Sequence, residues 1–350
     1  MTLRVIIYRL GVIPLLLLLC ILAACSQQDL DQEEQGMVSL KVLASPGTKA
    51  GEGGTATATL PDKETDIFDL SIFIFNSNGD VIGFTSQDFK DGKPAAVEVK
   101  TRKETGCSVY AVANAKTLNG TSPFDGVSTL SVFKTKYLSF ADAKAPNNAN
   151  CLLMMGVSSD FDTSSASSAS PATITLKRLA SRIDYTIAVN NDQTTGFPIV
   201  VDSYQLRNVP TSTLYQQSDF TSPSMPSSPV FADLDKVSTP ISSVATPTSA
   251  GTYYVYANNG TSNETYLDIQ AHSEVQGAGT TYTVWKSNFQ VKMPDGKVLP
   301  NYHYKIDIVI NGSVKGKDGG VITTYNAYPY FSGSILNPWG TNENRDLDLQ

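Results

Sequence analysis

The sequence predicts an all-β protein, and three observations support this fold class. Only 17% of the 350 residues are charged, while Ser, Thr, Asn, Gly and Tyr are plentiful, which favours strands and turns. Short apolar runs and period-2 alternation recur along the chain between turn residues. No long segment has the 3.6-residue period of an amphipathic helix. At this length we expect two β-sandwich domains behind a targeting segment.

Residues 1–24 have the features of a secretory signal peptide. Arg4 and Arg9 precede the apolar run Leu15–Leu19, and the sequence Leu-Ala-Ala-Cys ends at Cys25, which is typical of a lipoprotein cleavage box. The uncharged stretch around this run is shorter than the roughly 20 residues that a membrane-spanning helix needs. We therefore predict that Cys25 becomes the lipidated first residue of the mature chain.

Residues 25–49 combine a tether with the first strand. Ser26–Gly36 is polar and acidic, so it is predicted to be flexible. Alternation of apolar and polar residues predicts a half-buried strand over Met37–Ala44. Its core-facing residues are predicted to be Val38, Leu40 and Val42. Pro46 and several glycines follow, which places Lys49 in an exposed loop.

Residues 50–165 are predicted to form the N-terminal sandwich. Asn76–Gly79 has the composition of a hairpin turn between the first two strands. The Ser-, Thr- and Ala-rich segment Asp160–Pro171 is predicted to be the domain boundary. The expected strands are Ile67–Phe75, Val81–Thr85, Val97–Lys100, Cys107–Asn114 and Leu152–Val157.

Residues 166–350 are predicted to form the C-terminal sandwich. Thr221–Ala250 is rich in Ser, Thr and Pro and is expected to be a long surface loop. The last segment, Val321–Trp339, is strand-like and rich in Tyr, Phe, Ile and Leu. The other expected strands are Thr173–Leu176, Arg182–Val189, Ile199–Leu206, Tyr253–Ala257, Thr265–Ala271, Thr281–Gln290 and Tyr302–Ile310.

Two cysteines remain beyond the lipidation site, Cys107 and Cys151. This number is too small for a disulfide-stapled scaffold. A single disulfide between the two and a pair of buried free thiols are both compatible with the sequence.

The sequence offers no recognisable catalytic, metal or cofactor site. The two histidines, His272 and His303, lie in or beside strand-like segments, far from any pair of cysteine ligands. The glycine-rich stretches Gly51–Gly54 and Gly316–Gly320 do not lead from a strand into a helix, as a phosphate-binding loop would. A formal net charge of −7 without a basic run argues against nucleic acid as a partner. We expect a protein that is not an enzyme.

The order of these motifs resembles that of the major fimbrial subunits of the Bacteroidales, the fimbrillin family. The resemblance spans nearly the whole mature chain. It begins with Cys25, the acidic tether, the first strand and a glycine-rich loop that carries a basic residue. The other motifs that carry it are Ile67–Gly79, Tyr110–Asn114, Met154–Gly156, Leu176–Ile183, Leu206–Pro210, Tyr254–Tyr256, Asn301–Ile306 and Trp339.

The resemblance implies two transthyretin-like sandwiches in a structural subunit of a surface fimbria. It also implies export as an outer-membrane lipoprotein, followed by cleavage by a trypsin-like protease in the loop after the first strand. In this sequence the cut would fall between Lys49 and Ala50. The strand with Val38, Leu40 and Val42 would leave together with the lipid.

Loss of a strand exposes unpaired backbone N–H and C=O groups beside an apolar groove. We expect the C-terminal tail of a neighbouring copy to fill this groove by β-strand addition, which produces a head-to-tail filament. Accessory fimbrial subunits, the processing protease and an unidentified surface receptor are the other expected partners. The expected donor residues are Tyr325, Tyr328, Tyr330, Phe331, Ile335, Leu336 and Trp339.

Two alternatives share many of these features. A tip, accessory or anchor subunit of the same system would retain its lipid or lack a usable donor tail. A surface glycan-binding lipoprotein would expose coplanar tyrosines to solvent, whereas a fimbrial sandwich would bury them between its sheets.

Overall fold

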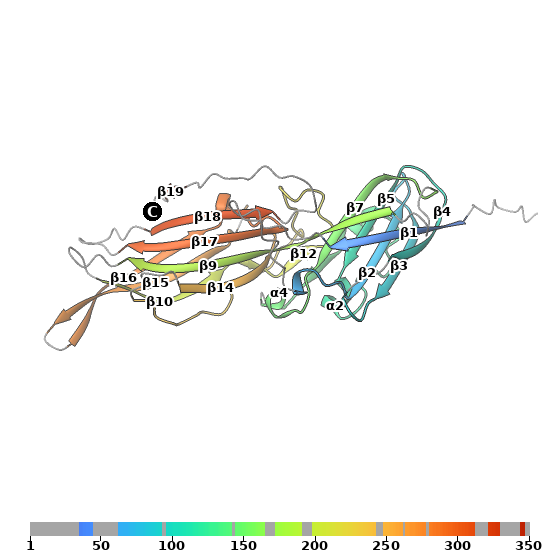
Figure 1. Ribbon diagram of the computed structural model, residues 1–350. Coiled ribbons are helices and arrows are strands. Elements are labelled where there is room, and N and C mark those ends of the chain that lie inside the picture. Colours follow the sequence, from blue (N-terminus) through green and yellow to red (C-terminus); the bar gives the residue numbers. More distant parts are fainter. Residues whose placement is uncertain are drawn as a thin grey trace, which may run out of the picture.

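The computed structural model describes eleven ranges of the chain. Across these ranges the protein consists of strands with a few short helices, which confirms the all-β fold class (Figure 1). The described ranges are residues 35–44, 62–92, 96–141, 144–164, 172–190, 198–242, 248–261, 263–277, 280–311, 321–329 and 344–346.

Where the sequence predicted an N-terminal sandwich, seven strands form a closed barrel at one end of the elongated molecule, because β1 pairs with both β4 and β8 (Figure 1). Their order around the barrel is β1-β4-β3-β2-β5-β7-β8. Alternate side chains point into the barrel and form its core, which includes Leu70, Ile72 and Ile74 of the second strand. The strands are β1 (Gln35–Ala44), β2 (Asp69–Phe75), β3 (Val81–Asp88), β4 (Val97–Arg102), β5 (Cys107–Ala113), β7 (Met154–Phe161) and β8 (Ala172–Arg178).

The other half of the molecule contains two further sheets. One has the strand order β14-β9-β17-β18-β19, and the other has the order β10-β15-β16. The strands are β9 (Ala180–Asn190), β10 (Ile199–Arg207), β14 (Thr248–Tyr256), β15 (Tyr266–Gly277), β16 (Thr280–Lys292), β17 (Tyr302–Asn311), β18 (Val321–Pro329) and β19 (Asn344–Asp346).

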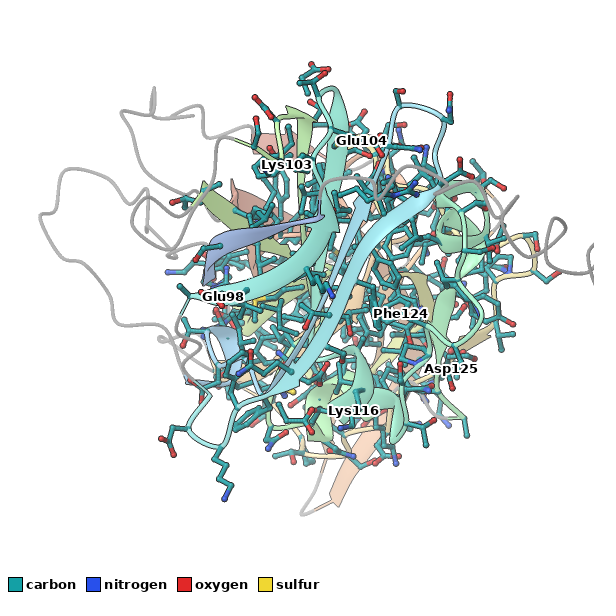
Figure 2. All side chains as sticks on the ribbon, turned by 90° about the vertical axis from the view of Figure 1, so that its right-hand side faces the viewer. Glu98, Lys103, Glu104, Lys116, Phe124 and Asp125 are labelled. Atoms are coloured by element: carbon teal, nitrogen blue, oxygen red, sulfur yellow. The ribbon has the colours of Figure 1, made fainter. Side chains whose placement is uncertain are left out.

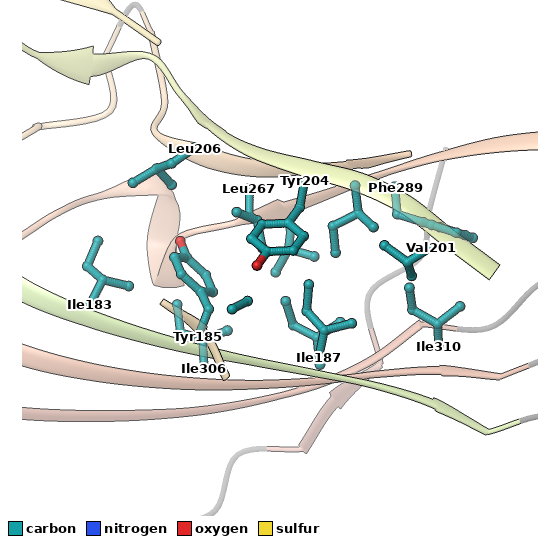
Figure 3. Packing of buried hydrophobic residues seen from close by; sticks show 14 of the residues in the cluster. Ile183, Tyr185, Ile187, Val201, Tyr204, Leu206, Leu267, Phe289, Ile306 and Ile310 are labelled. Carbon is teal, nitrogen blue, oxygen red and sulfur yellow. The ribbon is translucent and has the colours of Figure 1, made fainter. Parts of the chain in front are cut away.

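The two sheets bury an apolar core between them (Figure 3). Ile183, Tyr185 and Ile187 of β9 face this core from one side, and Val201 and Leu206 of β10 face it from the other. This arrangement is a sandwich, because side chains of both inner faces interdigitate in a single layer.

Short elements cover the region between barrel and sandwich. β6 pairs with β12, so residues from both halves of the chain meet there, and β11 pairs with β13 within the second half. These elements are β6 (Tyr137–Ser139), β11 (Val209–Pro210), β12 (Ser212–Leu214), β13 (Phe231–Ala232), α2 (Ala115–Asn119), α3 (Leu130–Thr135), α4 (Ala145–Asn148), η1 (Asp62–Glu64) and η2 (Pro294–Gly296).

An aromatic cluster joins the outer face of the barrel to the sandwich. Phe73 and Phe75 of β2 pack against Phe133 of α3, with ring centroids 5.2 and 5.8 Å apart. Tyr254 and Tyr256 of β14 belong to the same buried cluster. The two halves therefore share buried apolar surface instead of being joined by a bare linker.

The domain boundary lies later in the chain than the sequence indicated. We expected it at residues 165 and 166, but β8 pairs with β1 and β7, so the barrel extends to Arg178. The Ser- and Thr-rich segment before β8 lies between two strands of one sheet, and Ile174 and Leu176 enter the barrel core.

The segment Thr221–Ala250 is not a simple surface loop. Leu234 and Ile241 are 5% exposed and belong to the sandwich core. Val237 and Ile241 each form a single β-bridge with β10. The segment contacts the sheet through isolated apolar residues, which have no period that a sequence pattern could reveal.

Gly156 on β7 allows β8 to approach closely. A Cβ atom at this position would lie 2.6 Å from the backbone oxygen of Thr175 and 2.8 Å from Cγ2 of Ile174. We predict that Gly156→Ala lowers the free energy of unfolding by about 1–3 kcal/mol through overpacking. Val157→Ala is the control, because Val157 is 50% exposed. Equal urea midpoints for the two variants would contradict the prediction.

Candidate functional site

β1 completes the barrel by changing its partner halfway along its length. Residues Gln35–Leu40 pair antiparallel with β4, and residues Leu40–Ala44 pair parallel with β8. Figure 2 looks onto the barrel and shows Glu98 of β4 beside β1. Without β1, an open slot would remain, bordered by the unpaired edge of β4 along one half and by that of β8 along the other half.

The side chains of β1 that the structure describes fill the barrel core as predicted. Val38 and Leu40 are 0% exposed and belong to the same cluster as Val99 of β4 and Ile174 of β8. The backbone of Val42 pairs with Ile174. The slot that β1 occupies is therefore apolar inside and bordered by backbone hydrogen-bonding groups.

Several predicted site residues lie outside the described part of the chain. These are Cys25, Lys49 and Ala50 at the N-terminal side, and Tyr330, Phe331, Ile335, Leu336 and Trp339 in the tail. Lys49 belongs to the segment between Ala44 and Asp62. Lipidation, cleavage and the role of these tail residues stay predictions.

The first part of the predicted donor segment is a strand of the sandwich. Tyr325 and Tyr328 lie on β18, where they pair with Ile306 and His303 of β17. β18 would have to leave this sheet to act on a neighbour. This pairing favours a donor located beyond Pro329.

Cys107 and Cys151 are separate, buried free thiols, so the alternative of a disulfide does not apply to this structure. Cys107 lies in the barrel core. Burial, with smaller contributions from nearby carboxylates, raises the pKa of both thiols, and that of Cys151 to about 12. Both are thus protonated and unreactive at neutral pH.

A buried polar cluster that the sequence analysis did not find lies between barrel and sandwich. Glu64 of η1 is 0% exposed. Its Oε1 accepts hydrogen bonds from Tyr254 Oη at 2.8 Å and Arg182 Nη1 at 3.3 Å. The backbone oxygen of Glu64 accepts a bond of 2.7 Å from Arg178 Nε. These residues are far apart in the sequence, so no local pattern could have indicated their contact.

The cluster continues to Asp184 on β9. Its carboxylate lies 2.7 Å from His303 Nε2, 3.0 Å from Arg182 Nε and 2.7 Å from Thr252 Oγ1. Burial would raise the pKa of Asp184, but the hydrogen bonds from these three side chains and the charge of Arg182 outweigh it and hold the pKa well below its ordinary value. Asp184 is therefore a stable anion that orients His303 and Arg182.

The tyrosines whose side chains the structure describes do not form an exposed platform. Tyr185, Tyr215, Tyr256 and Tyr304 are at most 2% exposed. Among the tyrosines with described side chains, Tyr137 alone is exposed, at 54%. This arrangement fits packing within and between the sheets and gives no support to a glycan-binding surface.

The described ranges contain no group of three or more His, Cys, Asp or Glu side chains placed to hold a metal ion. Within the same ranges, no helix has the length and hydropathy needed to cross a membrane.

Fold and slot define a class of protein: an all-β protein with a barrel that is completed by β1, the first strand in the described part of the chain. The family model of the major fimbrial subunit protein (FimA) matches residues 37–196, from β1 into the sandwich. The match confirms the resemblance to the fimbrial subunits over these residues, which make up slightly less than half of the chain.

Solved structures share the fold. A putative cell adhesion protein from Parabacteroides distasonis has a TM-score of 0.61 and 17% identity, over 86% of this chain and 98% of that chain. One from Bacteroides eggerthii has a TM-score of 0.57 and 19% identity, over 85% and 96%. The tip fimbrial protein Mfa3 from Porphyromonas gingivalis has a TM-score of 0.52 and 13% identity, over 85% and 100%. No curated protein sequence matches the chain significantly.

We predict that Asp184→Asn lowers the free energy of unfolding by about 1.5–3 kcal/mol at neutral pH, because hydrogen bonds to a charged group are lost. The folded-state pKa of Asp184 is depressed, so this difference is fully present above about pH 4 and shrinks as the pH falls below it. Urea unfolding between pH 7 and pH 2.5 measures it. Asp202→Asn at the more exposed His272 pair is the control. A difference independent of pH would refute the assignment.

Proposed function

We propose that this protein is the polymerising structural subunit of a surface fimbria, exported as a lipoprotein and assembled by strand exchange. The observation that supports this proposal most is the position of β1, which by itself joins β4 to β8. β1 is also the described strand nearest to the predicted lipid anchor at Cys25. Removing the anchor by cleavage after β1 would open the barrel in the same step.

The residues on either side of the predicted cleavage loop have contacts that would let β1 leave while the rest of the chain stays in place. Ala44, at the end of β1, pairs with Leu176 on β8. Glu64, after the loop, is bonded to Arg178, two residues beyond Leu176. A cut at Lys49 would separate β1 from the chain covalently, while Glu64 would keep the new N-terminal segment attached to the body.

The empty slot would bind a strand of suitable pattern. Each buried side chain of the size of Val38 or Leu40 contributes about 1.5–3 kcal/mol, and the unpaired edges of β4 and β8 supply backbone hydrogen bonds. Such a slot would accept any segment that alternates apolar and small polar residues.

The tail beyond β18 has this pattern. Phe331, Gly333 and Ile335 alternate with Ser332 and Ser334, as Val38, Leu40 and Val42 alternate with polar residues in β1. We therefore propose Phe331–Ile335 as the centre of the donor strand, with Leu336 and Trp339 following it. Because donor and slot are different surfaces, each subunit can bind two neighbours, and the fibre grows head to tail. The fibre would support adhesion at the cell surface.

We predict that trypsin removes residues 25–49 from the purified precursor and that polymers then appear as a ladder on unheated gels. Lys49→Gln should leave β1 attached and the protein monomeric. Intact mass and N-terminal sequencing identify the cut. Trimming at Lys49 without multimers would contradict a polymerising subunit, and a loop that resists cleavage would favour a membrane anchor.

We predict that Ile335→Asp abolishes polymerisation of trimmed protein, because it would bury a carboxylate in the slot. Ser334→Asp is the matched control, since in an alternating strand its side chain faces the other way. Mixed with trimmed wild-type protein, Ile335→Asp should also shorten the ladder, because it accepts a donor strand but provides none. Equal ladders from both variants would place the donor elsewhere.

A further inference from the structure

The two strands that border the slot are held to the rest of the barrel mainly near one end. Residues Ala172–Leu176 of β8 pair with β1, whereas β7 pairs only with Lys177 and Arg178 among the described residues. β4 pairs with β1 from Val97 to Arg102. Its backbone pairing with β3, among the described residues, is that of Thr101 with Gly83. Departure of β1 would therefore leave both walls with few backbone hydrogen bonds.

Thr163 is hydrogen-bonded to the end of β4 that lies beside the start of β1. Its side chain is buried, and Oγ1 accepts a hydrogen bond of 2.7 Å from the backbone N–H of Glu104. The same hydroxyl donates to the backbone oxygen of Arg102 at 2.8 Å. Arg102 pairs with Gln35, the first residue of β1. In Figure 2, Glu104 marks this rim of the barrel.

Arg178 holds the end of β8 that lies beside the end of β1. It is 1% exposed, and its backbone N–H donates to Asn301 Oδ1 at 3.0 Å. Its Nε donates to the backbone oxygen of Glu64 at 2.7 Å. Glu64 is in turn held by Tyr254 and Arg182 of the sandwich. The wall is thus connected to the sandwich, which does not depend on β1.

We propose that Thr163 and Arg178 are positioning residues for strand exchange: they hold β4 and β8 at the correct separation while the slot is empty. The hydrogen bonds of Thr163 to Glu104 and Arg102, and of Arg178 to Asn301 and Glu64, do not involve β1, so they do not depend on its presence. The partner that this device serves is the incoming strand of a second copy, and the inference rests on the proposed function. A prepositioned slot binds a strand more tightly, because less conformational entropy is lost on binding.

Strand uptake by the cut precursor tests this inference. The full precursor is cleaved at Lys49, and a fluorescent peptide of sequence Gln35–Ala44 is added to exchange with the released strand. Thr163→Val and Arg178→Met should bind the peptide at least about 10-fold more weakly than wild type, equivalent to about 1.4 kcal/mol. The melting temperature of each uncut precursor measures its general stability, because β1 still holds β4 and β8 in place. A variant that melts as wild type does but binds the peptide weakly is impaired only in positioning the slot.

Two controls make the same exchanges of side chain in the sandwich, at the buried Thr265 and the partly exposed Arg207. Thr265→Val removes a hydroxyl that bonds Asn208 and Asn258, and Arg207→Met removes the pairs with Asp233 and Asp268. Both should bind the peptide as wild type does.

Peptide binding by Thr163→Val at wild-type affinity would overturn the inference. Thr163→Val exchanges a hydroxyl for a methyl group, so it keeps the test decisive even if Arg178→Met does not fold. If wild-type protein takes up no peptide after cleavage, the proposed strand exchange itself is refuted. That outcome is distinguishable from a failure of the positioning role alone.

Discussion

The backbone hydrogen bonding of β1 is the constraint on which the rest of the structure depends. Seven strands form a barrel only because β1 pairs with β4 over its first half and with β8 over its second half. A sheet that loses such a strand exposes two rows of unpaired backbone N–H and C=O groups and an apolar interior. The vacant slot must therefore be filled by another strand. The stability of the precursor and the proposed reactivity of the trimmed subunit would thus have the same physical origin.

The junction between barrel and sandwich is compatible with the proposed strand exchange in a mechanically continuous fibre. Aromatic side chains of both halves share one buried cluster, and Glu64 bonds to residues of β8, β9 and β14. Neither contact involves β1. A subunit could therefore exchange its first strand while its two halves remain fixed relative to each other, as transmission of force along a filament requires.

Local features were predictable from the sequence, and long-range features were not. The hairpin at Asn76–Gly79 follows from turn chemistry, since Gly79 has a φ of +86° and Asn76 Oδ1 accepts the N–H of Asn78. The inward faces of Val38 and Leu40 follow from alternation. Assignment of β8 to the barrel depends on pairing with β1, more than 100 residues earlier in the chain. The contact of Glu64 with Arg182 depends on the folded arrangement as well, so neither could be read from a local pattern.

Hydrogen exchange of the backbone amides tests the role of β1 most directly. The amides of β4 and β8 should be protected in the precursor, exchange rapidly once residues 25–49 have been cut off and removed, and regain protection in the polymer, while β2 and β5 stay protected throughout. Unchanged protection of β4 and β8 after removal of β1 would contradict the account, because the barrel would then close without its first strand.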